Sequence, residues 1–223
     1  MGVRKIKTFG GQKQTQPIKD PKLLKEIIFL LKSKIDKAKT PVKRYQAYRN
    51  FMIFFIGVNT AFRAEDLLQL RRCDINGYVH IKENKTGKMQ NYKLAKDVQN
   101  EIDAYCDEFK IGRYDYIFRG QKKQEDGKPY IYPLNRQQGH KIISSIGKEV
   151  GLEAHFGLHS LRKTFGYQYV KNGGNVNTLM RMYNHSSLEV TQIYISWNSD
   201  DAETTRSEFC ISATGTIKKG KGK

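Results

Sequence analysis

Hydrophobic residues recur at helical spacing along most of the chain. After Asp20-Pro21, a typical helix start, apolar residues return every three or four positions up to about Ala38. Thr40-Pro41 repeats the start signal, and the helix that follows ends in an apolar run, 51–58, which predicts a place in the core. A third helix is predicted over 61–72, because acidic residues stand near its positive N-terminal end.

The pattern then changes to that of strands. Residues 78–81 are β-prone, 84–87 have the composition of a turn, and 89–94 can return as a second strand. This arrangement predicts an antiparallel hairpin. Residues 116–118 are a candidate for a third short strand, and the polar, Gly- and Pro-containing stretch 119–132 predicts a surface loop.

Helical spacing returns in the second half of the chain. It predicts helices over 94–109, 135–150, 159–172, 176–183 and 187–195. The expected fold class is therefore mainly α with a small antiparallel β-sheet (α+β). Residues 1–19 contain five basic residues and no acidic one, which predicts a flexible basic arm, and 212–223 predict a disordered basic tail. Between the folded part and this tail lies an acidic segment, 197–211.

The charge balance points to a polyanionic partner. The 223 residues include 40 Lys and Arg against 22 Asp and Glu, a formal net charge of +18, which favours nucleic acid. The longest apolar run, 51–58, is far shorter than the roughly 20 residues of a membrane helix, and no secretory signal opens the chain. Three widely spaced cysteines predict neither a disulfide framework nor a zinc site. We therefore expect a cytoplasmic protein without a membrane span.

A few residues stand out as candidates for chemistry. His159 and Arg162 are three positions apart on a predicted helix, so both can face one phosphate. Arg63 stands at a helix start, Lys85 at the tip of the predicted hairpin, and Tyr194 nine positions after His185. Taken singly, each residue also has an ordinary structural explanation, such as a surface arginine, a turn lysine or a half-buried aromatic.

The ordered combination is far more specific. The stretches TAFRAEDLLQL, NKTGK, HSLR and NHSSLEVTQIY resemble the catalytic domain of the tyrosine recombinase (phage integrase) family, and the resemblance spans residues 20–196. Lys85 is preferred to Lys88 as the hairpin lysine by counting back from Leu94. The matching positions are Arg63, Lys85, His159, Arg162, His185 and Tyr194.

This chain departs from the family pattern at four places. Ala61 and Asn184 stand where the family usually has glycine, and Lys163 where histidine is common. Asp66 replaces a glutamate, and we expect it to orient a neighbouring basic side chain. None of these changes removes a matching catalytic position.

The resemblance implies DNA cleavage and rejoining by transesterification. Tyr194 would attack a phosphodiester, forming a 3′-phosphotyrosyl bond and a free 5′-hydroxyl, with His159 taking the phenol proton. Arg63, Arg162 and His185 would stabilise the five-coordinate phosphorane, and Lys85 would protonate the leaving 5′-oxygen. Bond energy is kept in the covalent intermediate, so the implied reaction needs no nucleotide cofactor. With so many cationic donors, it requires no metal ion either.

The resemblance also implies the partners. We expect double-stranded DNA with paired recognition sites, bound by a homotetramer. The acidic residues 197–211 are either a helix that docks on a neighbouring subunit or a solvated helix without a partner. Most relatives carry a helical domain before the catalytic domain, and the residues before Asp20 are too few for one. We therefore expect either a minimal recombinase or a fragment of a longer one.

Two other functions remain open from the sequence. One is a DNA-binding regulator that keeps the recombinase fold without recombining DNA. The other is a type IB topoisomerase, which uses the same chemistry without synapsis. The complete set of six catalytic positions favours the active recombinase, because a regulator would be free to lose Tyr194 or an arginine.

Overall fold

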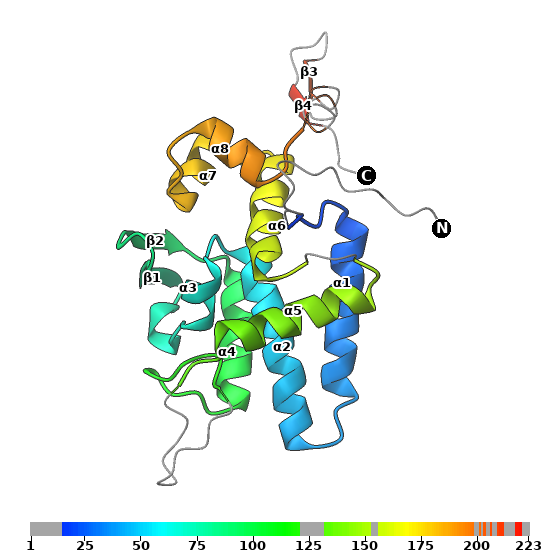
Figure 1. Cartoon of the computed structure of the whole chain (residues 1–223), viewed down its shortest axis with the longest axis vertical. Coiled ribbons are helices and arrows are strands. Elements are labelled where there is room, and N and C mark those ends of the chain that lie inside the picture. The colour runs from blue at the N-terminus through cyan, green and yellow to red at the C-terminus, as the bar shows by residue number, and fades with distance from the viewer. Residues whose placement is uncertain are drawn as a thin grey trace.

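Two long antiparallel helices begin the ordered part of the protein. The computed structural model describes residues 15–120, 132–152 and 156–198, with short pieces at 201, 203, 206, 209–211 and 217–219. Helix α1 (Pro21–Asp36) and helix α2 (Pro41–Asn59) lie side by side (Figure 1). Their predicted caps are present, because the Asp20 side chain accepts the Lys22 N–H and Thr40 accepts the Lys43 N–H.

Helix α2 runs through the centre of the core. Its apolar run is buried on all sides, with Phe51, Ile53 and Phe54 each 0% exposed. Around it pack α1, α4 (Lys96–Glu108), α5 (Arg136–Glu149) and α6 (Leu158–Lys171). The all-round apolar pattern of residues 51–58 therefore corresponds to a helix enclosed by other helices.

The predicted hairpin is present beside these helices. Strand β1 (Tyr78–Lys82) pairs antiparallel with β2 (Met89–Lys93), and Val79 and Ile81 turn to the buried side. A mainly helical fold with a small antiparallel sheet is thereby confirmed. The third strand predicted at 116–118 is not formed. Tyr116 makes only an isolated bridge with Arg71, and Ile117 and Phe118 are buried.

The third helix is shorter than the sequence predicts. Helix α3 (Ala64–Leu68) occupies the middle of the predicted range, and a 3₁₀ turn, η1 (Arg72–Asp74), follows it. The helix ends early because the next residues pair with a distant segment: the Leu70 carbonyl accepts the Ile117 N–H at 2.8 Å. Local periodicity could not indicate this long-range partner.

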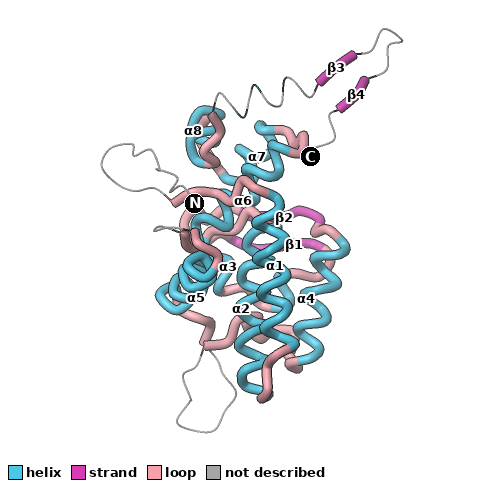
Figure 2. Tube along the Cα trace, turned by 90° about the vertical axis from the view of Figure 1, so that its right-hand side faces the viewer, coloured by secondary structure: helices cyan, strands magenta, loops and turns pink. Residues whose placement is uncertain are grey.

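Two short helices follow α6 and enclose a second small core. Helices α7 (Val176–Tyr183) and α8 (Leu188–Tyr194) lie at one end of the molecule, above the hairpin in both views (Figures 1 and 2). Tyr183, Leu179 and Ile195 are buried between them and α6. The backbone of α6 comes so close at Gly166 that a Cβ there would lie 2.7 Å from Cγ2 of Ile195.

The segment before α1 is anchored, which corrects the prediction of a flexible arm over residues 1–19. Ile18 is only 2% exposed, and its N–H donates to the Thr164 hydroxyl of α6 at 2.8 Å. Lys19 forms an ion pair of 2.6 Å with Asp201. This finding covers residues 15–19, whereas 1–14 lie outside the described residues.

Near the end of the chain, two short strands differ from the sequence prediction. Strand β3 (Phe209–Ile211) pairs antiparallel with β4 (Ile217–Lys219). The sequence analysis predicts an acidic docking segment over the first range and a disordered tail over the second. Most other residues of these two segments lie outside the described part. Within the described ranges, no helix has the length and apolar character that a membrane span requires.

Candidate active site

All six predicted catalytic residues line one cavity. The cavity measures about 560 Å³ and lies between the start of α3, the β1–β2 hairpin, α6 and the α7–α8 pair. Elements far apart in the sequence therefore bring these side chains together. Among the described residues, no cluster of three His, Cys, Asp or Glu side chains could hold a metal ion. The lining positions from the sequence prediction are Arg63, Lys85, His159, Arg162, His185 and Tyr194.

Two arginines form the floor of the cavity and are fixed by backbone carbonyls. Arg63 and Arg162 each donate from Nη2 to the Tyr183 carbonyl at 3.1 Å, and Arg162 also donates from Nη1 to the Ala61 carbonyl. The Arg162 guanidinium lies 4.2 Å from the centroid of the Tyr183 ring. Burial lowers the pKa of Arg162, yet arginine stays charged in proteins. Two cations are thus aimed at the place where an anion would bind.

Tyr194 ends α8 and lies against two other rings. Its ring centroid is 5.4 Å from that of Tyr183 and 5.1 Å from that of His185. Burial raises the pKa of Tyr194 above its ordinary value, and the nearby Arg162 only partly offsets this effect. The phenol is therefore protonated at neutral pH and needs a base before it can attack.

His185 is held and kept neutral by its surroundings. Its Nδ1 atom lies 3.1 Å from the Thr191 hydroxyl, which fixes the ring against α8. Burial, together with the charges of Arg162 and Arg63, lowers the pKa of His185 to about 4. The imidazole is neutral at pH 7 and carries one N–H. Because the Thr191 hydroxyl donates to the Ser187 carbonyl at 3.2 Å, this N–H is on Nδ1 and donates to Thr191.

His159 and Lys85 are at the rim of the cavity, where both are exposed. Desolvation, followed by the charges of Arg136 and Arg162, lowers the pKa of His159, so its neutral ring can accept a proton. Lys85 stands in the turn of the hairpin and lines the cavity, whereas Lys88 does not.

Two residues of this site were not predicted from the sequence. Arg136, at the start of α5, also lines the cavity and lies 3.3 Å from Glu65. Glu83 follows β1 and is only 2% exposed, although it is acidic. The alternation of β1 could have indicated this burial. Val79 and Ile81 face the buried side, and Glu83 is the next residue in the same alternation.

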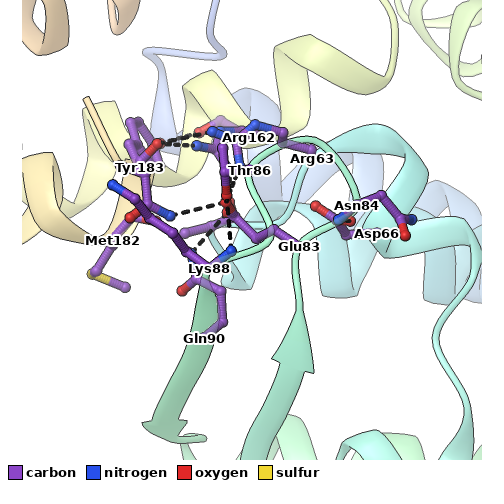
Figure 3. Close-up of polar contacts among 12 residues, drawn as sticks. Arg63, Asp66, Glu83, Asn84, Thr86, Lys88, Gln90, Arg162, Met182 and Tyr183 are labelled. Carbon is purple, nitrogen blue, oxygen red and sulfur yellow. Dashed lines mark hydrogen bonds and ion pairs between the residues drawn. The ribbon is translucent and has the colours of Figure 1, made fainter. Parts of the chain in front are cut away.

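Glu83, and not Asp66, forms the ion pair with Arg63 of the site. Its carboxylate forms an ion pair with Arg63 and lies near Arg162 and Tyr183 in Figure 3. Asp66 instead accepts the backbone N–H of Asn84 at 2.9 Å, and burial raises its pKa. The expectation that Asp66 orients a basic side chain is therefore wrong, because its carboxylate faces the backbone of the hairpin.

The departures from the family pattern also have structural explanations. Asn184 ends α7 with φ 54°, a left-handed conformation that glycine adopts easily and asparagine tolerates better than most residues. Ala61 is not among the described residues with positive φ, so glycine is not required there. Lys163 is 5% exposed, and its ammonium lies 5.2 Å from the centroid of the Tyr194 ring.

Comparison with known proteins identifies the family. Residues 29–200 match the phage integrase family. The chain belongs to this family. This phage integrase-family chain is 31% identical over 175 residues to the probable integrase/recombinase YoeC of Bacillus subtilis (strain 168), a match that covers 76% of this chain and 90% of YoeC.

Solved structures share the fold at lower sequence identity. The crystal structure of XerA recombinase matches with a TM-score of 0.65 and 18% identity, over 90% of this chain and 66% of that one. A post-cleavage complex of the XerH site-specific recombinase with a palindromic difH substrate matches with a TM-score of 0.64 and 22% identity, over 91% and 55%. This family member thus spans between about half and two-thirds of these two chains.

Proposed function

We propose that the protein is a site-specific DNA recombinase that cleaves and rejoins DNA through a 3′-phosphotyrosyl intermediate. The observation that carries this proposal is the single cavity lined by a tyrosine, two histidines, a lysine and three arginines. Family membership supports the same reaction. Integration, excision, inversion and resolution of DNA all use this chemistry.

The first half of the reaction needs a deprotonated phenol. Burial keeps the pKa of Tyr194 above its ordinary value, so the oxygen attacks phosphorus only as its proton leaves. His159 is the candidate base, because its own lowered pKa keeps the ring neutral and ready to accept that proton. The phenol oxygen forms a bond to phosphorus, and the bond to the 5′-oxygen breaks.

The remaining residues act on the phosphate and the leaving group. Arg63 and Arg162 offer guanidinium groups to the non-bridging oxygens, whose negative charge grows in the five-coordinate phosphorane. His185 lines the same cavity, and its Nε2 could contact the phosphate once the ring gains a proton. Lys85 then gives a proton to the departing 5′-oxygen, a role suited to an exposed cation on a hairpin turn.

Double-stranded DNA with paired recognition sites is the proposed partner. The net charge of +18 favours backbone contacts, and the XerH neighbour was solved with a DNA substrate. We further propose a tetramer on two synapsed duplexes. The docking segment would begin after Asp201, because that residue pairs with Lys19 of its own chain.

A trapped covalent adduct tests the proposal. A binding selection from random inverted repeats with the purified protein supplies the duplex, which is then nicked beside the scissile phosphate so that religation fails. The wild type should form a detergent-resistant protein–DNA adduct, and Tyr194→Phe should bind the duplex without forming one. Arg136→Ala, which keeps all six proposed catalytic groups, should still form the adduct, with weaker DNA binding.

The same experiment separates the recombinase from a DNA-binding regulator. A regulator would bind the selected duplex with high affinity and form no adduct with either protein. That outcome would contradict the proposed chemistry, whereas adduct formation that depends on Tyr194 would contradict the regulator.

A further inference from the structure

One buried carboxylate connects three parts of the active site. Glu83 is 2% exposed and accepts hydrogen bonds from Thr86, from Gln90 at 2.9 Å and from Asn184 at 2.9 Å, besides its ion pair with Arg63. Figure 3 labels three of these partners, Arg63, Thr86 and Gln90, together with Glu83. The contacts come from the start of α3, from the hairpin and from the turn between α7 and α8.

Three of these four partners are a catalytic residue of the proposed reaction or adjoin one. Thr86 follows Lys85 directly, and Asn184 precedes His185. The Arg63 guanidinium is itself fixed by the Tyr183 carbonyl at 3.1 Å. Gln90 of β2 donates both to Glu83 and to the Met182 carbonyl of α7, at 2.8 Å. The hairpin is thus fastened to the floor of the cavity at several points around Glu83.

We infer that Glu83 is a positioning residue that fixes the hairpin against Arg63 and Asn184 and so places Lys85 beside the leaving 5′-oxygen. This inference rests on the proposed function. Lys85 is exposed in the turn, so its position depends on the hairpin that carries it. Asp66 holds the base of the same turn through the backbone N–H of Asn84, but only Glu83 joins the turn to the arginine.

The charge of Glu83 matters as well as its shape. Burial opposes ionisation, but the hydrogen bonds from Thr86, Arg63 and Gln90 outweigh it and lower the pKa of this carboxyl. A neutral amide of the same size would keep part of the network and lose the charge-assisted contacts. Since hydrogen bonds to ionised groups are about twice as strong as neutral ones, the hairpin would loosen.

The substitution Glu83→Gln tests this role with the nicked duplex described above. We expect folding and DNA binding to persist, because removing a negative charge near the phosphate does not weaken an anion site. Single-turnover cleavage should fall on the order of 10²-fold, the cost typical of a displaced catalytic group. Glu108→Gln, which removes a carboxylate that pairs with Arg44 on the far side of the fold, is the matched control and should cleave at the wild-type rate.

A duplex with sulfur in place of the bridging 5′-oxygen identifies the step that is affected. A thiol is a far stronger acid than an alcohol, so the leaving thiolate departs without a proton from Lys85. This duplex should restore most of the lost rate for both Glu83→Gln and Lys85→Ala. It should not restore the cleavage rate of Arg162→Ala, because the charge lost in that variant acts on the non-bridging oxygens.

The outcomes distinguish the inference from the proposed function. If the wild type forms no adduct, the proposed function fails. If sulfur restores Lys85→Ala but not Glu83→Gln, or if Glu83→Gln cleaves the ordinary duplex at the wild-type rate, only the inference fails. Thr86→Val, which removes one hairpin donor to the same carboxylate, should show a smaller loss that sulfur also restores, and it remains informative should Glu83→Gln not fold.

Discussion

The protonation state of His159 gives the proposed reaction a specific pH dependence. A base must be neutral to accept a proton, and desolvation with nearby positive charge lowers the pKa of this ring. The neutral form therefore persists to lower pH than for an ordinary histidine. In single-turnover cleavage at subsaturating protein, the acid limb should therefore have its midpoint below the ordinary histidine pKa of about 6.5.

Two variants assign this acid limb. His159→Gln removes the base and should lower the rate on the order of 10²-fold while abolishing the limb. His185→Asn should keep the limb, because the pKa of His185 is already lowered to about 4. If the acid limb instead disappears in His185→Asn and persists in His159→Gln, the base is His185 and not His159.

The residues of the site that stand in short sequence motifs could be predicted from the sequence. The six cavity residues stand in short motifs, so their types and spacing indicated them before the fold was known. Glu83 has no such motif, since its role comes from contacts with Arg63 and Asn184 that lie far away in sequence. Asp66 illustrates the opposite error, because proximity in sequence suggested a contact that the fold does not make.

The same holds for the helices and strands. Their bounds could be predicted where local contacts fix them, but not where long-range contacts do. Helices α1 and α2 begin at the expected caps, because Asp20 and Thr40 need only the next turn of backbone to satisfy their hydrogen bonds. Helix α3 ends early because Leu70 pairs with Ile117, and no local pattern encodes that pairing. The segment before α1 is ordered for a similar reason, since Ile18 binds Thr164 of α6.

The contact between α6 and the α7–α8 pair gives a prediction for Gly166. A Cβ at this position would overlap the Tyr183 hydroxyl and lie 2.7 Å from Cγ2 of Ile195. Because Tyr183 supports Arg162 and packs on Tyr194, moving it disturbs the floor of the cavity. Gly166→Ala should lower the free energy of unfolding by about 1–3 kcal/mol and also reduce cleavage by the folded protein.

Gly57→Ala is the control for this effect. A Cβ there would lie 2.6 Å from Cδ1 of Leu161, in the contact between α2 and α6. Urea unfolding should show a comparable loss of stability, whereas cleavage measured well below the unfolding midpoint should be unchanged. Equal cleavage losses in the two variants would mean that global stability, not the position of Tyr183, sets the rate.

The segment before α1 and the segment after α8 meet on α6 through Asp201. Its carboxylate accepts from Lys19 at 2.6 Å and from the Tyr167 hydroxyl at 2.5 Å, and it joins residues 182 positions apart. Gln168 of α6 donates to the carbonyls of Ile18 and Lys19, each at 3.0 Å. The segment leading to α1 and the segment after Tyr194 are thereby held on the helix that carries Arg162.

Replacing Asp201 by asparagine should loosen both segments together. Burial opposes ionisation of Asp201, but the bonds from Lys19 and Tyr167 outweigh it and lower its pKa. A lowered folded-state pKa stabilises the protein above the unfolded value of about 3.9, and this contribution is lost as pH falls through the folded value. At pH 7 the substitution should cost about 1–3 kcal/mol of unfolding free energy, the range for hydrogen bonds to a charged group.

Urea unfolding at pH 7 and at pH 3 measures this contribution. The difference in the free energy of unfolding between wild type and Asp201→Asn should be larger at pH 7 than at pH 3. Protonation of Asp201 at low pH removes the same charge from the wild type. Glu203→Gln, which changes an exposed carboxylate two positions later, should leave the free energy of unfolding within about 0.5 kcal/mol of wild type. An equal effect of the two substitutions would show that overall charge, rather than the contacts with Lys19 and Tyr167, governs stability. If Asp201→Asn is destabilising as expected, the contacts of Asp201 with Lys19 and Tyr167 stabilise the packing of both segments on α6, the helix that carries Arg162.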